Sequence, residues 1–322
     1  MSSFDEINED VLEIILANAI SNVAHLKRVS LVCKQWRCAA PRCVTRIHLR
    51  HYNSLEYAVS RICRIKELKI GVNRGEYVPY QSMSNIQDIS PLSGLTELVH
   101  LDISNTYVTD ISPLYGLTSL THLDMSHTYV TDISPLYGLT SLTHLDMSHT
   151  YVDDISPIKY KLKDISPVSG ITALLQLNME HTRVLSISLL SGFTSLVHLN
   201  MAYTCVVEHR VSMSVFIPSC LRRKVLDISP LAGLTSLSHL NMKGTRVKDI
   251  SPLEGLTSLV HLDISNTDVE DISPLAGLTS LVHLHMLNTD VDDISPLAGL
   301  TSLTYNGRSC LPADFFKFLI RI

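Results

Sequence analysis

Apolar residues recur along most of the chain with a period of 22 positions. In the unit that starts at Asp110 they occupy Ile111, Leu114, Leu117, Leu120, Leu123, Met125 and Val130. The apolar residues alternate with polar ones around Leu123 and Met125, which predicts a short β-strand. Its polar face would carry His122, Asp124 and Ser126.

A tight helical turn is expected just before each strand. Ser112 and Pro113 are typical of a helix cap and a first helical residue, and Gly116 is typical of a helix stop. A coil of 22 residues cannot bury seven apolar side chains by itself, but stacked coils can. The pattern therefore predicts an α/β repeat, a solenoid with a parallel sheet on its concave side.

The tetrad Asp-Ile-Ser-Pro marks the start of each coil and shows how far the array extends. It begins at Asp88, Asp110, Asp132, Asp154, Asp164, Asp227, Asp249, Asp271 and Asp293, and it is degenerate at Ser186. Residues 106–127 and 128–149 are identical, which indicates recent duplication. We expect about nine to ten units over residues 88–305.

The spacing Leu120-x-x-Leu123-x-Met125-x-x-Thr128-x-Val130 resembles the signature of leucine-rich repeats. The 22-residue period and the phrase DISPL-x-GLTSL are similar to the internalin-type subclass, and the resemblance covers roughly residues 88–304. Threonine stands where the family usually has asparagine. We expect this column to be structural, with its hydroxyls bonding backbone groups from one coil to the next.

Two places break the period, at 154–163 and at 208–226. The second carries Arg210, Arg222, Arg223 and Lys224 beside Phe216. Each break is either a specificity loop or the product of neutral decay. Residues 306–322 leave the pattern and are expected to cap the array.

Residues 4–43 have a different, helical pattern. The run Val32-Cys33-Lys34-Gln35-Trp36 and the earlier run from Ile7 to Ile15 resemble an F-box, with Ile7 and Asn8 departing from the family's Leu-Pro. We therefore divide the chain into a small all-α, F-box-like module (1–45), irregular first repeats (46–87), the regular repeats and the cap.

The F-box resemblance implies a substrate receptor of an SCF-type cullin–RING ubiquitin ligase. Its partners would be the adaptor subunit of the ligase, bound by the F-box, and a protein client, bound by the repeats. The expected adaptor-binding residues are Ile7, Val11, Leu12, Ile15, Val32 and Trp36. The alternative is a repeat scaffold without a ubiquitin-ligase role, in which residues 4–43 only cap the solenoid.

Two polar columns are expected to lie side by side on the concave sheet, about 4.8 Å from strand to strand. One is a histidine column, and the next holds aspartate in the first coils and mainly asparagine later. The client-binding candidates from these columns are His100, Asp102, His122, Asp124, His144 and Asp146. The columns are interpretable as a solvated ladder copied by duplication, as a pH-responsive surface or, least readily, as a metal site.

A shorter tyrosine column follows the strands and completes the client-binding candidates. It consists of Tyr107, Tyr129 and Tyr151, and arginine, cysteine or aspartate replaces it in later coils. Tyrosine is favoured at binding hot spots, although duplication multiplies any tyrosine without selection.

Composition narrows the function further. The 322 residues are 45% hydrophobic and carry a net charge of −5, which gives no bulk attraction to nucleic acid or to anionic lipid. No apolar run reaches the roughly 20 residues that a membrane span needs. The seven scattered cysteines favour a reduced, cytoplasmic protein, with the nucleus as an alternative. No catalytic motif is found, so we expect neither an enzyme nor a cofactor.

Overall fold

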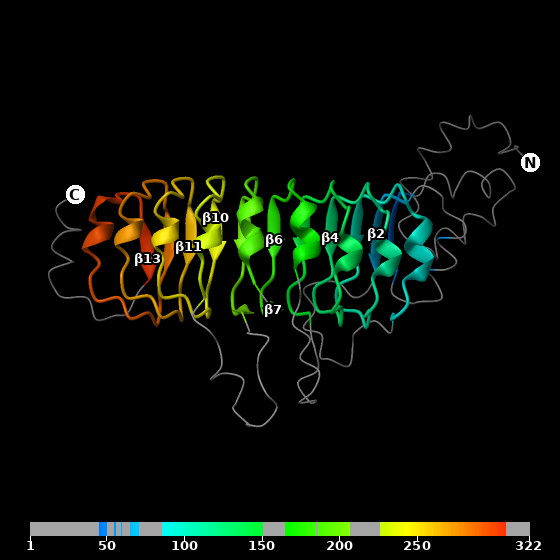
Figure 1. Ribbon diagram of the computed structural model, residues 1–322, viewed down its shortest axis with the longest axis horizontal. Helices are drawn as coiled ribbons and strands as arrows, with labels where there is room; N and C mark the ends of the chain where they lie inside the picture. The colour runs from blue at the N-terminus through cyan, green and yellow to red at the C-terminus, as the bar shows by residue number, and fades with distance from the viewer. Residues whose placement is uncertain are drawn as a thin grey trace, which may run out of the picture. The chain divides into compact units, whose positions relative to one another are not determined.

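The computed structural model describes residues 45–49, 55, 59, 65–70, 86–150, 165–184, 186–206 and 226–306. The chain forms two compact units, residues 1–177 and 178–322. Within the described ranges, no helix has the length and apolar character that crossing a bilayer requires. Each unit is a stack of coils of the kind that the repeat predicts (Figure 1).

One coil shows how the apolar period determines the structure. A 3-10 helix, η4 (Ser112–Leu114), precedes a three-residue strand, β4 (His122–Asp124). All seven apolar side chains that the pattern placed inside the coil are buried, at 2% exposure or less. Their burial between neighbouring coils supplies the stability that a single coil lacks.

In the first unit the strands pair in parallel, each with the next one along the chain. They are β1 (Arg46–Leu49), β2 (Glu67–Ile70), β3 (His100–Asp102), β4 and β5 (His144–Asp146). β6 (Gln176–Asn178) spans the division between the units. The other helical turns are η3 (Ser90–Gly94), η5 (Ser134–Leu136) and η6 (Ser166–Gly170). The register aligns His100, His122 and His144.

The second unit has the same parallel order. Its main strands are β8 (His198–Asn200), β10 (His239–Asn241), β11 (His261–Asp263), β12 (His283–His285) and β13 (Thr304–Asn306). Its helical turns are η7 (Ser188–Gly192), η9 (Ser229–Leu231), η10 (Ser251–Leu253), η11 (Ser273–Leu275) and η12 (Ser295–Gly299). β7 (Arg183–Val184) and β9 (Cys205–Val206) form a separate two-stranded sheet. β13 closes the predicted array, and only Asn306 of this strand lies beyond residue 305.

The caps of the helical turns differ from the sequence prediction. Ile111 is the N-cap of η4 and makes no side-chain cap bond, so the predicted serine cap is wrong. Instead, Asp110 Oδ1 accepts the backbone N–H of Ser112 at 2.8 Å. The same aspartate-to-serine bond, at 2.7 to 2.9 Å, starts the other turns at Asp88, Asp132, Asp227, Asp249, Asp271 and Asp293. Pro113 in the first turn and the stop at Gly116, where φ is 88°, are confirmed.

The threonine column is structural, as predicted, but its hydrogen bonds run differently. Thr128 is fully buried, and its hydroxyl donates to the Met125 carbonyl three residues earlier in the same coil, at 2.7 Å. Thr204 donates to the Met179 carbonyl of the preceding coil, at 2.8 Å. The prediction of bonds from coil to coil is therefore wrong for most of the column, because the turn after the strand brings the carbonyl of the same coil within reach.

Several sequence predictions lie outside the described residues. They include the F-box-like segment, with Ile7, Val11, Leu12, Ile15, Val32 and Trp36, and the candidate contact Tyr151. The break at 154–163, the break at 208–226 apart from Leu226, and the cap apart from Asn306 also lie outside.

Candidate binding face of the strands

The histidine column is a set of stacked imidazole rings on the outward face of the strands. In the first unit the ring centroids of His100, His122 and His144 are 4.0 Å apart from one ring to the next. In the second unit the separations are 4.2 to 4.4 Å, along His198, His239, His261 and His283. The rings lie closer than the strand spacing. They are also close to parallel, so their outward nitrogens do not converge on one metal ion.

Hydroxyl groups hold some of these rings in place. Thr121 Oγ1 lies 2.7 Å from His122 Nδ1 and 3.2 Å from the Val99 carbonyl oxygen. That oxygen already accepts two backbone N–H groups, those of Thr121 and His122. A hydroxyl proton directed at Nδ1 instead leaves the ring proton on the outward Nε2.

The environment of the stack disfavours imidazolium. Desolvation, together with the neighbouring rings of His144 and His100, lowers the pKa of His122 from 6.5 to about 4, against the opposing effect of Glu67. Burial and neighbouring histidines also lower the pKa of His239 and His261 in the second unit. At neutral pH these three rings are uncharged hydrogen-bonding groups.

The aspartates beside the histidines have a structural task that the sequence analysis did not anticipate. Asp124 Oδ1 accepts both the backbone N–H of Ser126, at 3.0 Å, and its hydroxyl, at 2.7 Å. Asp102 and Asp146 make the same pair of bonds to Ser104 and Ser148. The carboxylates therefore fix the turn that follows each strand.

Ser126 itself lies elsewhere than predicted. It was expected on the open face with His122 and Asp124, yet it is buried, at 1% exposure. The strand ends at Asp124, so the alternation of inward and outward side chains stops there.

Charge is unevenly distributed along the aspartate column of the first unit. Lys69 Nζ lies 2.8 Å from Asp102 Oδ2 and neutralises that carboxylate. Burial raises the pKa of Asp124, and the nearby carboxylates Asp146 and Asp102 add to the rise, against the lowering effect of the Ser126 hydrogen bonds. The face around β4 and β5 thus favours neutral or positively charged contacts.

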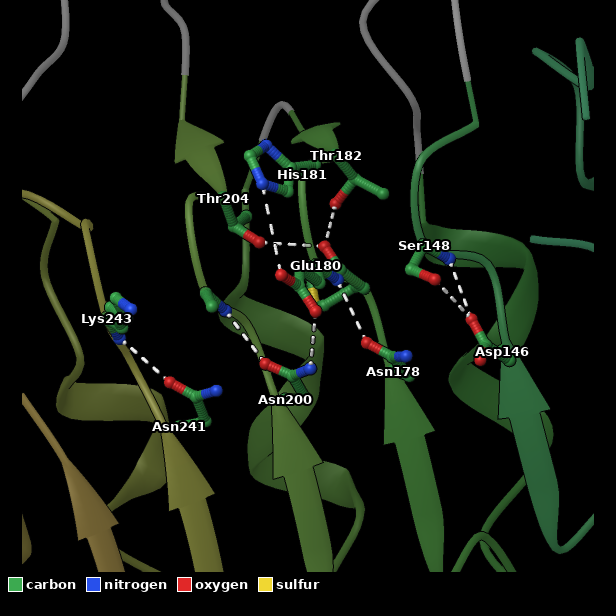
Figure 2. A network of polar contacts seen from close by, with 12 residues as sticks. Asp146, Ser148, Asn178, Glu180, His181, Thr182, Asn200, Thr204, Asn241 and Lys243 are labelled. Carbon is green, nitrogen blue, oxygen red and sulfur yellow. Dashed lines mark hydrogen bonds and ion pairs between the residues drawn. The ribbon is translucent and has the colours of Figure 1, made fainter. Parts of the chain in front are cut away.

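In three coils of the second unit an asparagine replaces the aspartate, and the serine two residues later is replaced as well. The pairs are Asn178 with Glu180, Asn200 with Ala202 and Asn241 with Lys243. Each asparagine Oδ1 still accepts the backbone N–H two residues on, at 3.0 to 3.2 Å (Figure 2). Asn200 Nδ2 also donates to Glu180 Oε2 at 3.0 Å. An asparagine amide is therefore sufficient to hold the turn after the strand where no serine hydroxyl is present.

A further column, in the left-handed backbone region, was missed by the sequence analysis. It contains Asn105, His127, His149, His181, Tyr203, Gly244, Asn266 and Asn288, with φ between 48° and 67°. Asparagine and glycine at half of these positions were the available sequence signal. His127 and His149 stack at 4.5 Å, as do His181 and Tyr203.

Two of the tyrosine candidates, Tyr107 and Tyr129, lie in a column as the sequence predicted. The rings of Tyr107 and Tyr129 stack at 5.6 Å. Tyr115 and Tyr137 stand at the ends of η4 and η5, and are 71% and 67% exposed. The first unit therefore presents aromatic surface at two places on each of these coils.

Comparison with known proteins agrees with this architecture. Residues 118–160 and 257–299 match the family model "Leucine Rich repeats (2 copies)". No F-box domain is detected in the chain. No curated protein sequence matches the chain significantly.

Three solved structures illustrate the fold similarity. An internalin (InlF) from Listeria monocytogenes is 26% identical with a TM-score of 0.66, covering 91% of this chain and 74% of the internalin. TLR13 in its ssRNA13 complex is 14% identical with a TM-score of 0.53, covering 93% and 41%. The plant receptor kinase GASSHO1/SCHENGEN3 ectodomain from Arabidopsis thaliana, in complex with CASPARIAN STRIP INTEGRITY FACTOR 2, is 14% identical with a TM-score of 0.54, covering 84% and 33%.

Proposed function

We propose that this array of leucine-rich repeats is a protein-binding module that uses the outward face of its strands. The main observation behind this proposal is that histidine forms one aligned column and aspartate or asparagine the next. The aspartate and asparagine side chains are themselves fixed by hydrogen bonds to the turns that follow the strands. Side chains fixed in this way lose little freedom when a partner binds, which favours affinity. The plant receptor ectodomain, which shares the fold, is described in complex with a named factor, and this supports the proposal.

We assign the module no catalytic role, cofactor or metal. In the described residues, His122, His239 and His261 at neutral pH and the turn-holding carboxylates act as hydrogen-bonding groups, and the chain has no recognised catalytic motif. Its partner is a protein, with no nucleic acid or membrane required. The TLR13 neighbour is described with a single-stranded RNA, so an RNA oligonucleotide is the appropriate negative control.

Site-specific photo-crosslinking tests the binding face. A photoreactive phenylalanine analogue is placed at His122, on the outward face, and in a matched protein at Ser119, an exposed position outside the strand. Incubation with cell extract should give discrete protein adducts from position 122 only. Equal adducts from both positions, or none from position 122 in a folded protein, would overturn the proposal.

The finer proposal is that the module serves as the substrate receptor of an SCF-type ubiquitin ligase. Its support is the sequence of residues 4–43, where Val32 to Trp36 matches the F-box phrase in full. Ile7, Val11, Leu12 and Ile15 would contact the adaptor, and the repeats would hold the client. This role places the protein in the cytoplasm or the nucleus.

A pulldown with purified SCF adaptor tests this finer role. The full chain should retain the adaptor, whereas a deletion of residues 1–45 and the double variant Val11→Asp/Ile15→Asp should not. Far-ultraviolet circular dichroism of the variant should match that of the parent, so that lost binding is separated from lost folding. If the folded full chain fails to retain the adaptor, the ligase role is rejected and the binding module remains.

A further inference from the structure

The coil of β10 carries His239 and Asn241 on its strand and Lys243 two residues beyond the strand, three side chains that can donate hydrogen bonds. In the neighbouring coil of β11 the corresponding residues are His261, Asp263 and Ser265, which include a carboxylate. The chemistry of the outward face therefore changes between two adjacent strands that share one register.

The amide of Asn241 is oriented by its own turn. Its Oδ1 accepts the backbone N–H of Lys243 at 3.0 Å (Figure 2). Because the oxygen is engaged, the Nδ2 group is the part of the side chain that is left to meet a partner. Asn200 on β8 is oriented in the same way by the N–H of Ala202, and its Nδ2 donates to Glu180.

The tautomer of His239 depends on its hydroxyl neighbour. Ser238 Oγ lies 2.7 Å from His239 Nδ1 and 3.2 Å from the Val197 carbonyl oxygen. The Val197 oxygen already accepts the backbone N–H groups of Ser238 and His239. A serine proton directed at Nδ1 instead makes Nε2–H an outward donor.

Lys243 supplies the positive charge. Its Nζ lies 6.0 Å from the centroid of the Tyr203 ring. Within the described part of the chain, Lys243 forms no ion pair, whereas Arg246 pairs with Asp268 and Lys248 pairs with Glu270. A lysine without a carboxylate partner beside oriented amide and imidazole donors favours an anionic group.

We propose that the strip formed by His239, Asn241 and Lys243 binds a carboxylate of an extended acidic segment of a protein partner. This inference rests on the proposed function and specifies the partner's chemistry. Asp263 in the adjacent coil of β11, and Glu180 two coils away on the other side, bound the strip. The acidic side chain is therefore held at one place and is not attracted over a wide surface.

The repeat itself supplies the matched variant. Asn241→Asp/Lys243→Ser gives β10 the aspartate–serine pair found at 102/104, 124/126, 146/148 and 263/265. The variant should fold, because these four coils hold the same turn with that pair. It removes two donors and a positive charge and introduces a carboxylate.

The probe is an acetylated, amidated hexaglutamate peptide, titrated at pH 7 into the isotope-labelled full chain, with hexalysine as the opposite-charge probe. Hexaglutamate should shift the NMR signals of the Asn241 side-chain amide and of Lys243 more than those of the β11 and β12 coils. In the double variant its affinity should fall at least about tenfold, the scale of one lost charged hydrogen bond. Equal shifts in both proteins, or no shift at β10, would overturn the inference.

The same titration separates this inference from the proposed function. If hexaglutamate fails at β10 while position 122 still gives protein adducts, only the acidic-segment inference is rejected. If both fail, the strands have no binding face of the proposed kind.

Discussion

Asp124 Oδ1 accepts two hydrogen bonds from the same residue, the hydroxyl of Ser126 at 2.7 Å and its backbone N–H at 3.0 Å. Among the coils from β3 to β12, those that lack the serine have asparagine in place of aspartate, or, in the coil of β12, His285 with Leu287. The residues at these two positions therefore vary together along the repeat. Their first role is to hold the turn of their own coil.

The first prediction is that these two positions are energetically coupled. Ser126→Ala should lower the free energy of unfolding by about 1–2 kcal/mol, because the half-buried carboxylate of Asp124 loses one of its donors. In an Asp124→Asn background the same change should cost under about 0.5 kcal/mol, since Asn200 with Ala202 already uses that combination. Urea unfolding of the four proteins measures the coupling. Additive costs would show that the two positions act independently.

The second prediction concerns pH. The pKa of His122 is lowered from 6.5 to about 4, so between these values the unfolded chain binds more protons than the folded one. His122 therefore leaves stability intact above pH 6.5 and reduces it as the pH falls toward 4. His239 and His261 act in the same direction in the second unit because their pKa values are also lowered.

Urea unfolding at pH 7.5 and at pH 5.0 tests this prediction. The loss of stability at pH 5.0 should be smaller in His122→Asn than in the parent. The raised pKa of Asp124 acts in the opposite direction, and comparing parent with variant at each pH isolates the histidine. An NMR titration giving His122 a pKa near 6.5 would contradict the account.

The apolar period was sufficient to predict the coil but insufficient to predict how its ends are held. Leu114, Leu123 and Val130 are buried where the pattern placed them, because burial follows directly from periodicity. The buried Ser126 could not be predicted from alternation, since that depends on where the strand ends. The role of Asp110, which accepts the backbone N–H of Ser112 at the start of η4, was missed because serine and aspartate both bond readily to backbone N–H groups at helix starts and only geometry separates them.

The sequence was sufficient to predict which residues of the binding face align in columns, but not which hydrogen-bonding groups those residues present. The period alone aligned His100 with His122 and placed Asp102 beside Asp124. Two features depend on distances of about 3 Å that the sequence does not contain. They are the contact of Thr121 with the His122 ring and the hydrogen bond that orients the amide of Asn241. The left-handed column escaped notice because its residue type changes from coil to coil and includes Tyr203, a bulky residue that is uncommon there.

The third prediction tests the buried threonines. Thr128→Val keeps the shape of the side chain but removes the hydroxyl that donates to the Met125 carbonyl at 2.7 Å. The free energy of unfolding should fall by about 1–2 kcal/mol, because the fully buried site then holds an unsatisfied carbonyl and no new packing. Thr118→Val, at an exposed threonine of the same unit, serves as the control and should change stability by less than about 0.5 kcal/mol. Equal effects at both positions would show that the hydroxyl bond is unimportant.

The last prediction concerns the contact between Tyr203 and Gly244. A Cβ atom at Gly244 would lie 2.3 Å from two carbons of the Tyr203 ring, and its backbone φ of 67° is strained for alanine. Gly244→Ala should therefore cost about 2–4 kcal/mol, of which about 1 kcal/mol is backbone strain and the remainder the clash with the ring.

Removing the ring separates the two causes. In a Tyr203→Ala background the cost of Gly244→Ala should fall to the backbone part, about 1 kcal/mol. Gly255→Ala is the matched control, because a Cβ there meets nothing within 4 Å and no positive φ is involved. Thermal and urea unfolding of these variants measure the cost. An unchanged cost of Gly244→Ala without the tyrosine ring would mean that the backbone alone requires glycine. The predicted fall would mean that the Tyr203 ring excludes a side chain at position 244.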